Sequence, residues 1–435
     1  MALVSQLVEQ FFAQNNGELY FDGKVAVRDI AQQFGTPLFV YDGSVLDRKF
    51  AVLQKAVGEH LGIYYSVKAN PQKRILECFL EKGCGLEVAS VGEFFQARGA
   101  GCPAEKIFFA GPGKTPYELE VVLKERIGEI HVESFTELDR VAAIGKKLGV
   151  RPCISVRVNP SSEALGGAMR MGGKPSPFGI DEEKLEEFLT RVHTFSHIQL
   201  QGIHLFAGTQ ILDSQVLLAQ YQKGLNLAAT VSEYIGRPLQ TVDFGGGLGI
   251  PYFPQDQPLN MEEFSCGINQ VFAQVHRDSK FQGTTFIIEP GRFLVGESGV
   301  YVVKVNDIKV SRGKKFIVVD GGMHQHLAAS GNLGQVIKKN YPIGHLMKLD
   351  QSDGETADVV GPLCTPLDTL ARNILLPSVE IGDLIGIFQS GSYAKTASPL
   401  NFLSHASPPE VFVLNGNVTL LPDISVLPIN EVNTV

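Results

Sequence analysis

Basic residues are too few and too scattered in this sequence to form a surface for nucleic acid. The 435 residues include 38 lysines and arginines against 46 aspartates and glutamates, for a formal net charge of −8, and no Lys/Arg-rich block is present. Binding to a polyanion requires concentrated positive charge. Nucleic acid and an anionic membrane are therefore excluded as main partners, and a small molecule or a modest protein surface is expected instead.

Paired cysteines are also absent. The six cysteines form no CxxC pair and have no regular spacing: Cys78, Cys84, Cys102, Cys153, Cys266 and Cys364. Disulfide frameworks and zinc sites both require such pairing, so we expect no metal and a reducing cytoplasm. The first twelve residues lack the basic segment and the uninterrupted apolar stretch of a signal peptide, and they predict a short amphipathic helix.

Short apolar runs alternate with segments of helical periodicity from about residue 60 to 305. The alternation predicts an α/β fold of eight β-then-α units, either a (β/α)₈ TIM barrel or an open doubly wound sheet. We favour the barrel because eight units close it. The runs are Gly62–Val67, Gly85–Ala89, Lys106–Ala110, Ile127–Glu133, Cys153–Val158, Gln201–Phe206, Thr241–Phe244 and Thr285–Ile288.

The pattern changes after about Tyr301 to short strands separated by turns, which predicts an all-β C-terminal domain, a sandwich or barrel. Residues 18–43 also read as strands with turn residues between them, so this domain is expected to include N-terminal strands. The predicted domains are a barrel at 45–300 and a β domain made of 1–44 and 301–435.

Lys68 lies at the end of the first predicted barrel strand, in the run Tyr64-Tyr-Ser-Val-Lys68-Ala-Asn-Pro. A lysine that is desolvated at such a position can lose its proton and attack an aldehyde, as in enzymes that use pyridoxal phosphate (PLP). The alternative is an ordinary surface lysine.

Two further motifs follow the seventh and eighth predicted strands, at the end of a barrel where catalytic groups gather. Gly245-Gly246-Gly247 lets backbone N–H groups approach an anion such as a phosphate. Glu289-Pro-Gly291-Arg292 places a carboxylate and a guanidinium within one turn, where they can address a pyridine nitrogen and a phosphate or carboxylate. The alternatives are a structural turn and a surface ion pair.

In the predicted β domain, Gly361-Pro-Leu-Cys364-Thr-Pro-Leu-Asp368 places a thiol four residues before an acid, and Gly391-Ser-Tyr393 places a phenol beside a turn. A buried cysteine usually serves packing. In an exposed cleft, Cys364 can return a proton to a carbanion and Asp368 can bind an amine.

Together these residues resemble the fold type III PLP-dependent decarboxylases, the group of diaminopimelate, ornithine and arginine decarboxylases, over nearly the whole chain. The matching motifs are Tyr65-Ser-Val-Lys68-Ala-Asn, Phe109-Ala-Gly-Pro-Gly-Lys114, Arg157-Val-Asn-Pro, Phe178-Gly-Ile, Gly245-Gly-Gly, Glu289-Pro-Gly-Arg292, Gly361-Pro-Leu-Cys364 and Gly391-Ser-Tyr393.

The resemblance implies an enzyme in which Lys68 binds PLP covalently and Glu289 pairs with the pyridine nitrogen, and the lack of cysteine pairs in the sequence makes it a cytoplasmic one. It implies a phosphate site at Gly246, Gly291 and Tyr393, with Gly245, Gly247 and Arg292 beside them. It also implies a head-to-tail homodimer, in which Cys364 and Asp368 enter the active site from the partner subunit.

Two departures from the family pattern narrow the substrate. Phe206 stands where the family has a histidine that stacks on the pyridine ring; it can still stack, while Thr209 keeps a hydroxyl for the phosphate. His204 is then either a core histidine that points away or part of the site. The run Val319-Asp-Gly-Gly-Met-His324-Gln-His lacks the arginine with which diaminopimelate decarboxylases hold the far end of the substrate, and we take His324 as a candidate substrate contact.

Several runs, including Met171-Gly-Gly-Lys-Pro-Ser-Pro-Phe178, are similar to a narrower branch from butirosin and siderophore assembly. The resemblance implies an amino-acid substrate whose distal end is extended or tethered to an acyl carrier protein. Alternatives are a decarboxylase of a free diamino acid, a PLP-dependent racemase with Cys364 as the second base, and a non-catalytic decarboxylase-like regulator.

Overall fold

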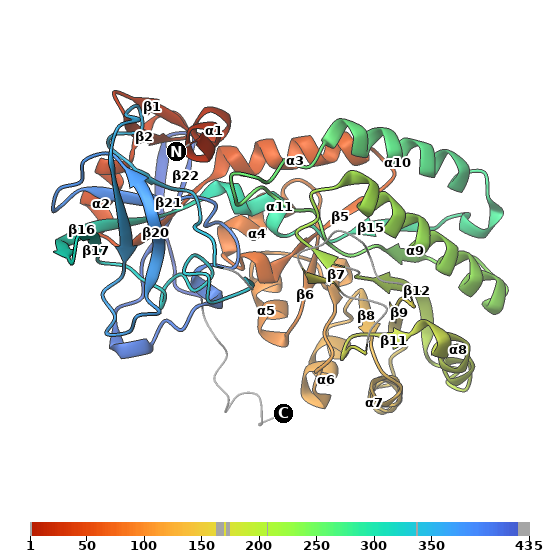
Figure 1. The fold of residues 1–435 in the computed structure, drawn as a ribbon. Helices are drawn as coiled ribbons and strands as arrows, with labels where there is room; N and C mark the ends of the chain where they lie inside the picture. Colours follow the sequence, from red (N-terminus) through yellow and green to blue (C-terminus); the bar gives the residue numbers. More distant parts are fainter. Residues whose placement is uncertain (1, 162–168, 171–174, 207, 336–337, 425–435) are drawn as a thin grey trace. The chain divides into compact units, whose positions relative to one another are not determined.

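The computed structural model describes residues 2–161, 169–170, 175–206, 208–335 and 338–424, drawn in Figure 1. The chain forms two compact units. The barrel unit is built from Ala51–Ile250 and Pro258–Gly291, and the β unit from Met1–Phe50, Pro251–Gln257 and Arg292–Asp423. Met171–Lys174, part of a run that indicated the narrower branch, lie outside the described residues.

Eight parallel strands close the barrel unit among the described residues, because β15 pairs with β5 and β8 pairs with β9. This confirms the predicted barrel. The strands are β5 (Gly62–Ser66), β6 (Gly85–Val88), β7 (Ile107–Phe109), β8 (Glu129–Val132), β9 (Cys153–Asn159), β12 (Gln199–Leu205), β14 (Thr241–Asp243) and β15 (Thr285–Ile288). A short strand, β11 (Ile180–Asp181), extends the sheet beside β9.

Helices connect the barrel strands, and local signals set their ends. Ser90, Thr115 and Ser134 each accept a backbone N–H at a helix N-terminus, and Gly149 ends a helix in the left-handed region at φ +67°. The connecting helices are α4 (Lys73–Leu80), α5 (Val91–Gly99), α6 (Pro116–Lys124), α7 (Phe135–Leu148), α8 (Leu185–His193), α9 (Ser214–Ile235) and α10 (Met261–Val275), and α3 (Gly43–Val57) leads from β4 (Leu38–Asp42) into the first barrel strand.

The β unit is organised around an N-terminal strand, β4 (Leu38–Asp42). β4 pairs with β16 (Gly299–Ser311) on one side and with β22 (Glu410–Leu414) on the other, which confirms that N-terminal residues join this domain. The sheet also contains β17 (Lys314–Val319), β18 (Ile343–His345), β19 (Glu355–Val360), β20 (Thr369–Leu376), β21 (Leu384–Ile387) and β23 (Asn417–Leu421).

The rest of the N-terminal segment packs on this unit. β1 (Ala13–Asn15), β2 (Glu18–Phe21) and β3 (Val25–Ala26) form a small sheet of their own, followed by α2 (Val27–Phe34). The predicted amphipathic helix is α1 (Ala2–Phe11), whose Val4, Leu7 and Val8 are buried in the same core as Val300 and Val302. Among the described residues, no helix has the length and apolar character needed to cross a bilayer.

Candidate active site

Lys68 lies in a single helical turn, η1 (Val67–Ala69), at the carboxyl end of β5. Its Nζ donates to both carboxylate oxygens of Glu87, at 2.9 and 2.7 Å. The Glu87 side chain, on β6, is only 1% exposed and also accepts Ser66 Oγ at 2.5 Å. A buried carboxylate therefore holds the amine, although the Lys68 side chain itself is 43% exposed and not desolvated as a buried lysine would be.

The predicted phosphate loop and the Glu289 turn lie against each other. A Cβ at Gly246 would be 2.8 Å from the Glu289 carbonyl oxygen, so only glycine permits this approach. Gly245 and Gly247 have φ values of +69° and +125°. Gly291 lies against the turn that carries Lys68, since a Cβ added at Gly291 would be 2.9 Å from Ala69 Cβ. In the same place, Ser66 N donates to Pro290 O at 3.3 Å. Lys68, the glycine loop and Glu289 are thus contiguous.

Replacing Gly291 with alanine is expected to disturb this packing. The added methyl must displace the turn that carries Lys68, and overpacking of this kind costs about 1–3 kcal/mol. We expect a lower free energy of unfolding by denaturant melts. Gly99→Ala is the matched control, because Gly99 is exposed at the end of α5 and a Cβ there meets no atom within 4 Å of the described residues. Equal stability of the two variants would contradict the prediction.

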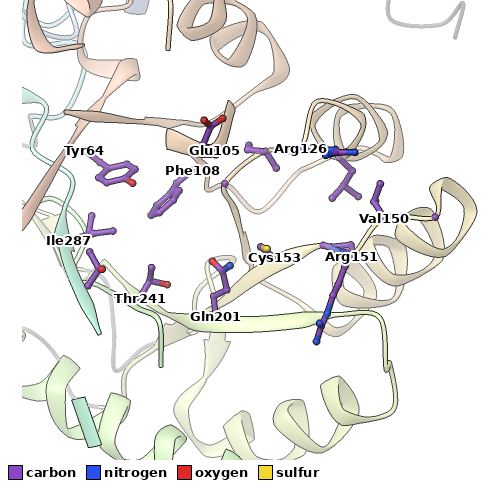
Figure 2. A pocket seen from close by; sticks show the side chains of 16 residues that line it. Tyr64, Glu105, Phe108, Arg126, Val150, Arg151, Cys153, Gln201, Thr241 and Ile287 are labelled. Atoms are coloured by element: carbon purple, nitrogen blue, oxygen red, sulfur yellow. The ribbon is translucent and has the colours of Figure 1, made fainter. Parts of the chain in front are cut away.

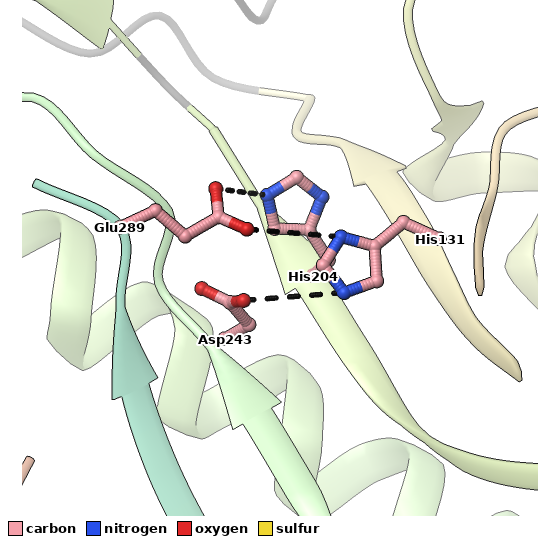
Figure 3. A group of neighbouring side chains, drawn as sticks. All are labelled: His131, His204, Asp243 and Glu289. Atoms are coloured by element: carbon pink, nitrogen blue, oxygen red, sulfur yellow. Dashed lines mark ion pairs between the residues drawn. The ribbon is translucent and has the colours of Figure 1, made fainter. Parts of the chain in front are cut away.

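Four buried side chains meet inside the barrel unit, as Figure 3 shows: His131, His204, Asp243 and Glu289. His204 Nε2 is 3.4 Å from Glu289 Oε2, His131 Nδ1 is 3.9 Å from Glu289 Oε1, and His131 Nε2 is 3.9 Å from Asp243 Oδ2. The two imidazole rings stack with centroids 4.2 Å apart. His204 is thus a buried histidine that lies beside Glu289.

The electrostatics of this group follow from its burial. Desolvation, with the charge of Glu289 next, holds the pKa of Asp243 well above its usual range. Desolvation, with His131 next, holds the pKa of His204 well below the usual value for histidine. Near Lys68, burial raises the pKa of Glu93 to about 7, so this carboxyl changes charge around neutral pH.

Arg157 and Phe206 form the next part of the site. The Arg157 guanidinium lies 5.8 Å from the Phe206 ring centroid, and its Nη1 donates to Glu133 Oε1 at 2.7 Å. Burial raises the pKa of Glu133, but the charges of Arg157 and Lys114 outweigh that effect and lower it. Phe206 also lies beside Gly245 and Gly246, with ring carbons 3.3 and 3.7 Å from the positions a Cβ would take there.

Thr209 follows on the same loop, in the short strand β13 (Gly208–Thr209). This strand pairs with β10 (Met169–Arg170). The carbonyl oxygen of Gly208 is 3.3 Å from the position of a Cβ at Gly247, so the loop that carries Thr209 lies against the glycine loop.

The remaining predicted site residues lie in the β unit. Arg292 Nη1 donates to Tyr252 Oη at 2.9 Å, and its guanidinium lies 4.7 Å from the Tyr393 ring centroid. Cys364 is exposed, but Asp368 is buried, and its two oxygens accept Met323 N at 2.6 Å and Leu363 N at 2.9 Å. Asp368 therefore shapes the loop that carries Cys364.

An open hollow of about 660 Å³ lies at the other end of the barrel (Figure 2). Its lining includes Thr241 and Thr285, the first residues of β14 and β15, and Cys153, the first of β9. It contains none of the predicted site residues. Since chemistry in such barrels gathers at the carboxyl ends of strands, the group around Lys68 and Glu289 is the candidate active site.

Three polar residues of the site were not predicted from the sequence: Glu87, His131 and Asp243. Each is a polar residue inside a short apolar strand, in the runs Gly85-Leu-Glu87-Val, Glu129-Ile-His131-Val and Thr241-Val-Asp243. Charged residues are rarely buried without partners. A polar residue inside an apolar strand is thus the signal that would have identified them.

The known proteins that this chain resembles belong to one family. Residues 44–296 match the family described as "Pyridoxal-dependent decarboxylase, pyridoxal binding domain". The chain is 35% identical to L-glutamyl-[BtrI acyl-carrier protein] decarboxylase of Niallia circulans, covering 90% of this chain and 92% of that protein. It is 31% identical to diaminopimelate decarboxylase of Aquifex aeolicus, covering 94% of both.

A solved structure with a similar fold comes from the same family. The crystal structure of diaminopimelate decarboxylase from M. jannaschii in co-complex with L-lysine matches with a TM-score of 0.86 at 25% identity, over 97% of this chain and 99% of that chain.

The residues present in the barrel unit fit PLP. Lys68 supplies an amine, the loop Gly245–Gly247 carries no side chains that would cover its backbone N–H groups, and Glu289 Oε1 is a buried oxygen without a hydrogen-bond partner among the described residues. These groups match an aldehyde, a phosphate and a pyridine nitrogen respectively. The chain belongs to the pyridoxal-dependent decarboxylase family, and it is a PLP-dependent amino-acid decarboxylase.

Proposed function

We propose that this decarboxylase acts on an L-amino acid whose distal end is extended or joined to an acyl carrier protein. The observation that carries the proposal is the 35% identity to L-glutamyl-[BtrI acyl-carrier protein] decarboxylase over 90% of this chain. A decarboxylase of free diaminopimelate is the second candidate, because such an enzyme is 31% identical over 94% of this chain.

The loop around His324 supports the tethered substrate over the free diamino acid. His324 is buried, its ring centroid lies 4.7 Å from that of His405, and both its ring nitrogens lack a hydrogen-bond partner among the described residues. Desolvation, with His405 next, lowers the pKa of His324 to about 4, so the ring is neutral at pH 7. A neutral imidazole can bond to an amide or thioester carbonyl, but it gives no cation for a second free carboxylate.

In the proposed reaction, PLP supplies the sink for the electron pair left on Cα when carbon dioxide departs. Lys68 would hold the cofactor through Nζ, and Glu289 would keep the proton on its pyridine nitrogen. Phe206 would exclude water from the outgoing carboxylate. The phosphate would be held by the glycine loop with Thr209, Gly291, Arg292 and Tyr393.

We further propose a homodimer in which Cys364 and Asp368 enter the active site of the partner subunit. Cys364 is exposed in its own chain, so its thiol is accessible for returning a proton to Cα. Asp368 already accepts two backbone N–H groups, and each of its oxygens keeps a lone pair with which to bind a substrate amine.

Carbon dioxide release from a substrate panel tests the proposal. The panel contains free glutamate, γ-extended glutamate, glutamyl thioester on a carrier protein, diaminopimelate, lysine and ornithine. We expect kcat/KM for the extended or tethered substrates to exceed that for the free diamino acids by about 10²-fold or more, the range that one mismatched polar contact supports. Activity confined to diaminopimelate, lysine or ornithine would refute the tethered substrate and leave the second candidate.

His324→Phe gives a matched test of the substrate contact. Losing one hydrogen bond of about 1 kcal/mol should raise KM for the preferred substrate roughly fivefold, with kcat little changed. An unchanged KM would remove His324 from the substrate site.

A further inference from the structure

The buried side chains that surround Glu289 include too many ionisable groups for all of them to be charged. Besides His131, His204, Asp243 and Glu289, they include Glu129, whose Oε1 is 3.2 Å from His131 Nε2. All five are at most 5% exposed. Three ionised carboxylates would outnumber the two imidazoles even if both rings carried a proton, and a buried charge without a partner is strongly unfavourable. At least one proton must therefore be shared within the group.

Hydrogen-bond geometry indicates which carboxyl holds that proton. Asp243 Oδ1 accepts Gly245 N at 2.8 Å, but Asp243 Oδ2 and Glu289 Oε1 have no partner among the described residues. Two anions cannot donate to each other, whereas a proton on Asp243 makes it a donor. The raised pKa of Asp243, caused first by burial and then by Glu289, agrees with this assignment.

The imidazoles lie near the carboxylate of Glu289. His204 Nε2 lies 3.4 Å from Glu289 Oε2, and neither ring nitrogen of His204 has a hydrogen-bond partner among the described residues. Its lowered pKa keeps the ring neutral, so it presents one N–H and adds no competing positive charge. Other charged groups that face His204 are Arg157, Glu133 and Glu87, which partly offset one another.

We propose that His204, His131 and Asp243 are positioning residues that hold Glu289 as an anion and orient it toward the pyridine nitrogen of the cofactor, with the shared proton on Asp243. The inference rests on the proposed role of Glu289. Asp243 would also connect Glu289 with the predicted phosphate loop, since its Oδ1 accepts Gly245 N.

Asp243→Asn is the decisive variant. The amide oxygen can still accept Gly245 N, and its NH₂ replaces the proposed O–H, so Asp243→Asn should lose much less kcat/KM than Asp243→Leu. Asp243→Leu removes both bonds and should lower kcat/KM by about 10- to 100-fold, as loss of supporting contacts behind a first ligand does. A loss larger than tenfold in Asp243→Asn would show that Asp243 acts as an anion and would overturn the assignment.

His204 is tested by a readout that is independent of turnover. In the holoenzyme reconstituted with PLP labelled with ¹⁵N in the ring, the pyridine nitrogen resonance reports its protonation directly. We expect a protonated nitrogen in the wild type and Asp243→Asn, a shift toward the unprotonated form in His204→Phe, and partial rescue in His204→Gln, which keeps a donor. His197→Gln is the control, since His197 bonds only to Ala142 O among the described residues.

The outcomes separate this inference from the proposed function. An unchanged ¹⁵N resonance in a folded His204→Phe holoenzyme would overturn the positioning role, whatever the substrate. The expected resonances together with activity on free diaminopimelate alone would refute the tethered substrate and leave the positioning role standing. A zinc ion bound stoichiometrically by the four residues and lost in His131→Gln would also overturn the proposal, because a metal would then hold Glu289.

Discussion

Lys68→Ala is expected to lower kcat by at least about 10³-fold, the scale seen when a nucleophile or proton-transfer group is removed. Alanine has no amine to bind the cofactor aldehyde, so borohydride should no longer fix PLP to the chain. The buried Glu87 would also lose its cationic partner, held at 2.7 Å in the wild type. Carbon dioxide release and peptide mapping of the reduced protein measure both effects.

Lys124→Ala is the matched control for this experiment. The Lys124 side chain is 42% exposed and pairs with Glu120 at 2.9 Å, while that of Lys68 is 43% exposed and pairs with Glu87 at 2.7 Å. The control loses a similar amine and ion pair on α6, away from the candidate site, and should retain activity and labelling. Labelling that persists in Lys68→Ala and maps to another lysine would contradict the assignment.

Glu289→Gln is expected to lower kcat/KM by about 10²- to 10³-fold, as removal of one electrostatic partner of a reacting group does. A neutral amide cannot stabilise a proton on the pyridine nitrogen, so the electron sink weakens even if the cofactor remains bound. The absorbance spectrum of the bound cofactor should change together with the rate.

Glu137→Gln controls for the loss of a buried carboxylate as such. Glu137 is 5% exposed in the same barrel unit and pairs with Lys114 at 2.6 Å. We expect this variant to be less stable but spectroscopically normal. A spectrum and rate in Glu289→Gln equal to those of the wild type would exclude Glu289 from contact with the pyridine nitrogen.

The periodicity of the sequence was sufficient to predict the barrel strands, because strand length, β-branched residues and helical spacing are local properties. It also placed Lys68, the glycine loop and Glu289 at strand ends, which the closed barrel makes contiguous. The pairing of β4 with β16 and β22 was predicted only in outline, because no local pattern specifies partners so far apart along the chain.

The group behind Glu289 could not be assembled in the same way. His131, His204 and Asp243 come from three different strands, and their contacts depend on which side chains face inward, which a one-residue change of register reverses. The structural bonds of Asp368 could not be predicted for a related reason. Its bonds to Met323 N and Leu363 N join two loops that only tertiary folding brings together.

The position of β4 has a consequence for synthesis of the chain on the ribosome. Phe39 of β4 pairs with Tyr301 of β16 and Glu410 of β22, and Tyr41 Oη donates to Glu410 Oε1 at 2.7 Å. One edge of β4 must therefore wait for β16 to emerge, and its other edge stays unpaired until β22 emerges. We expect nascent chains stalled before β22 to have a complete barrel and to recruit chaperones at their amino terminus.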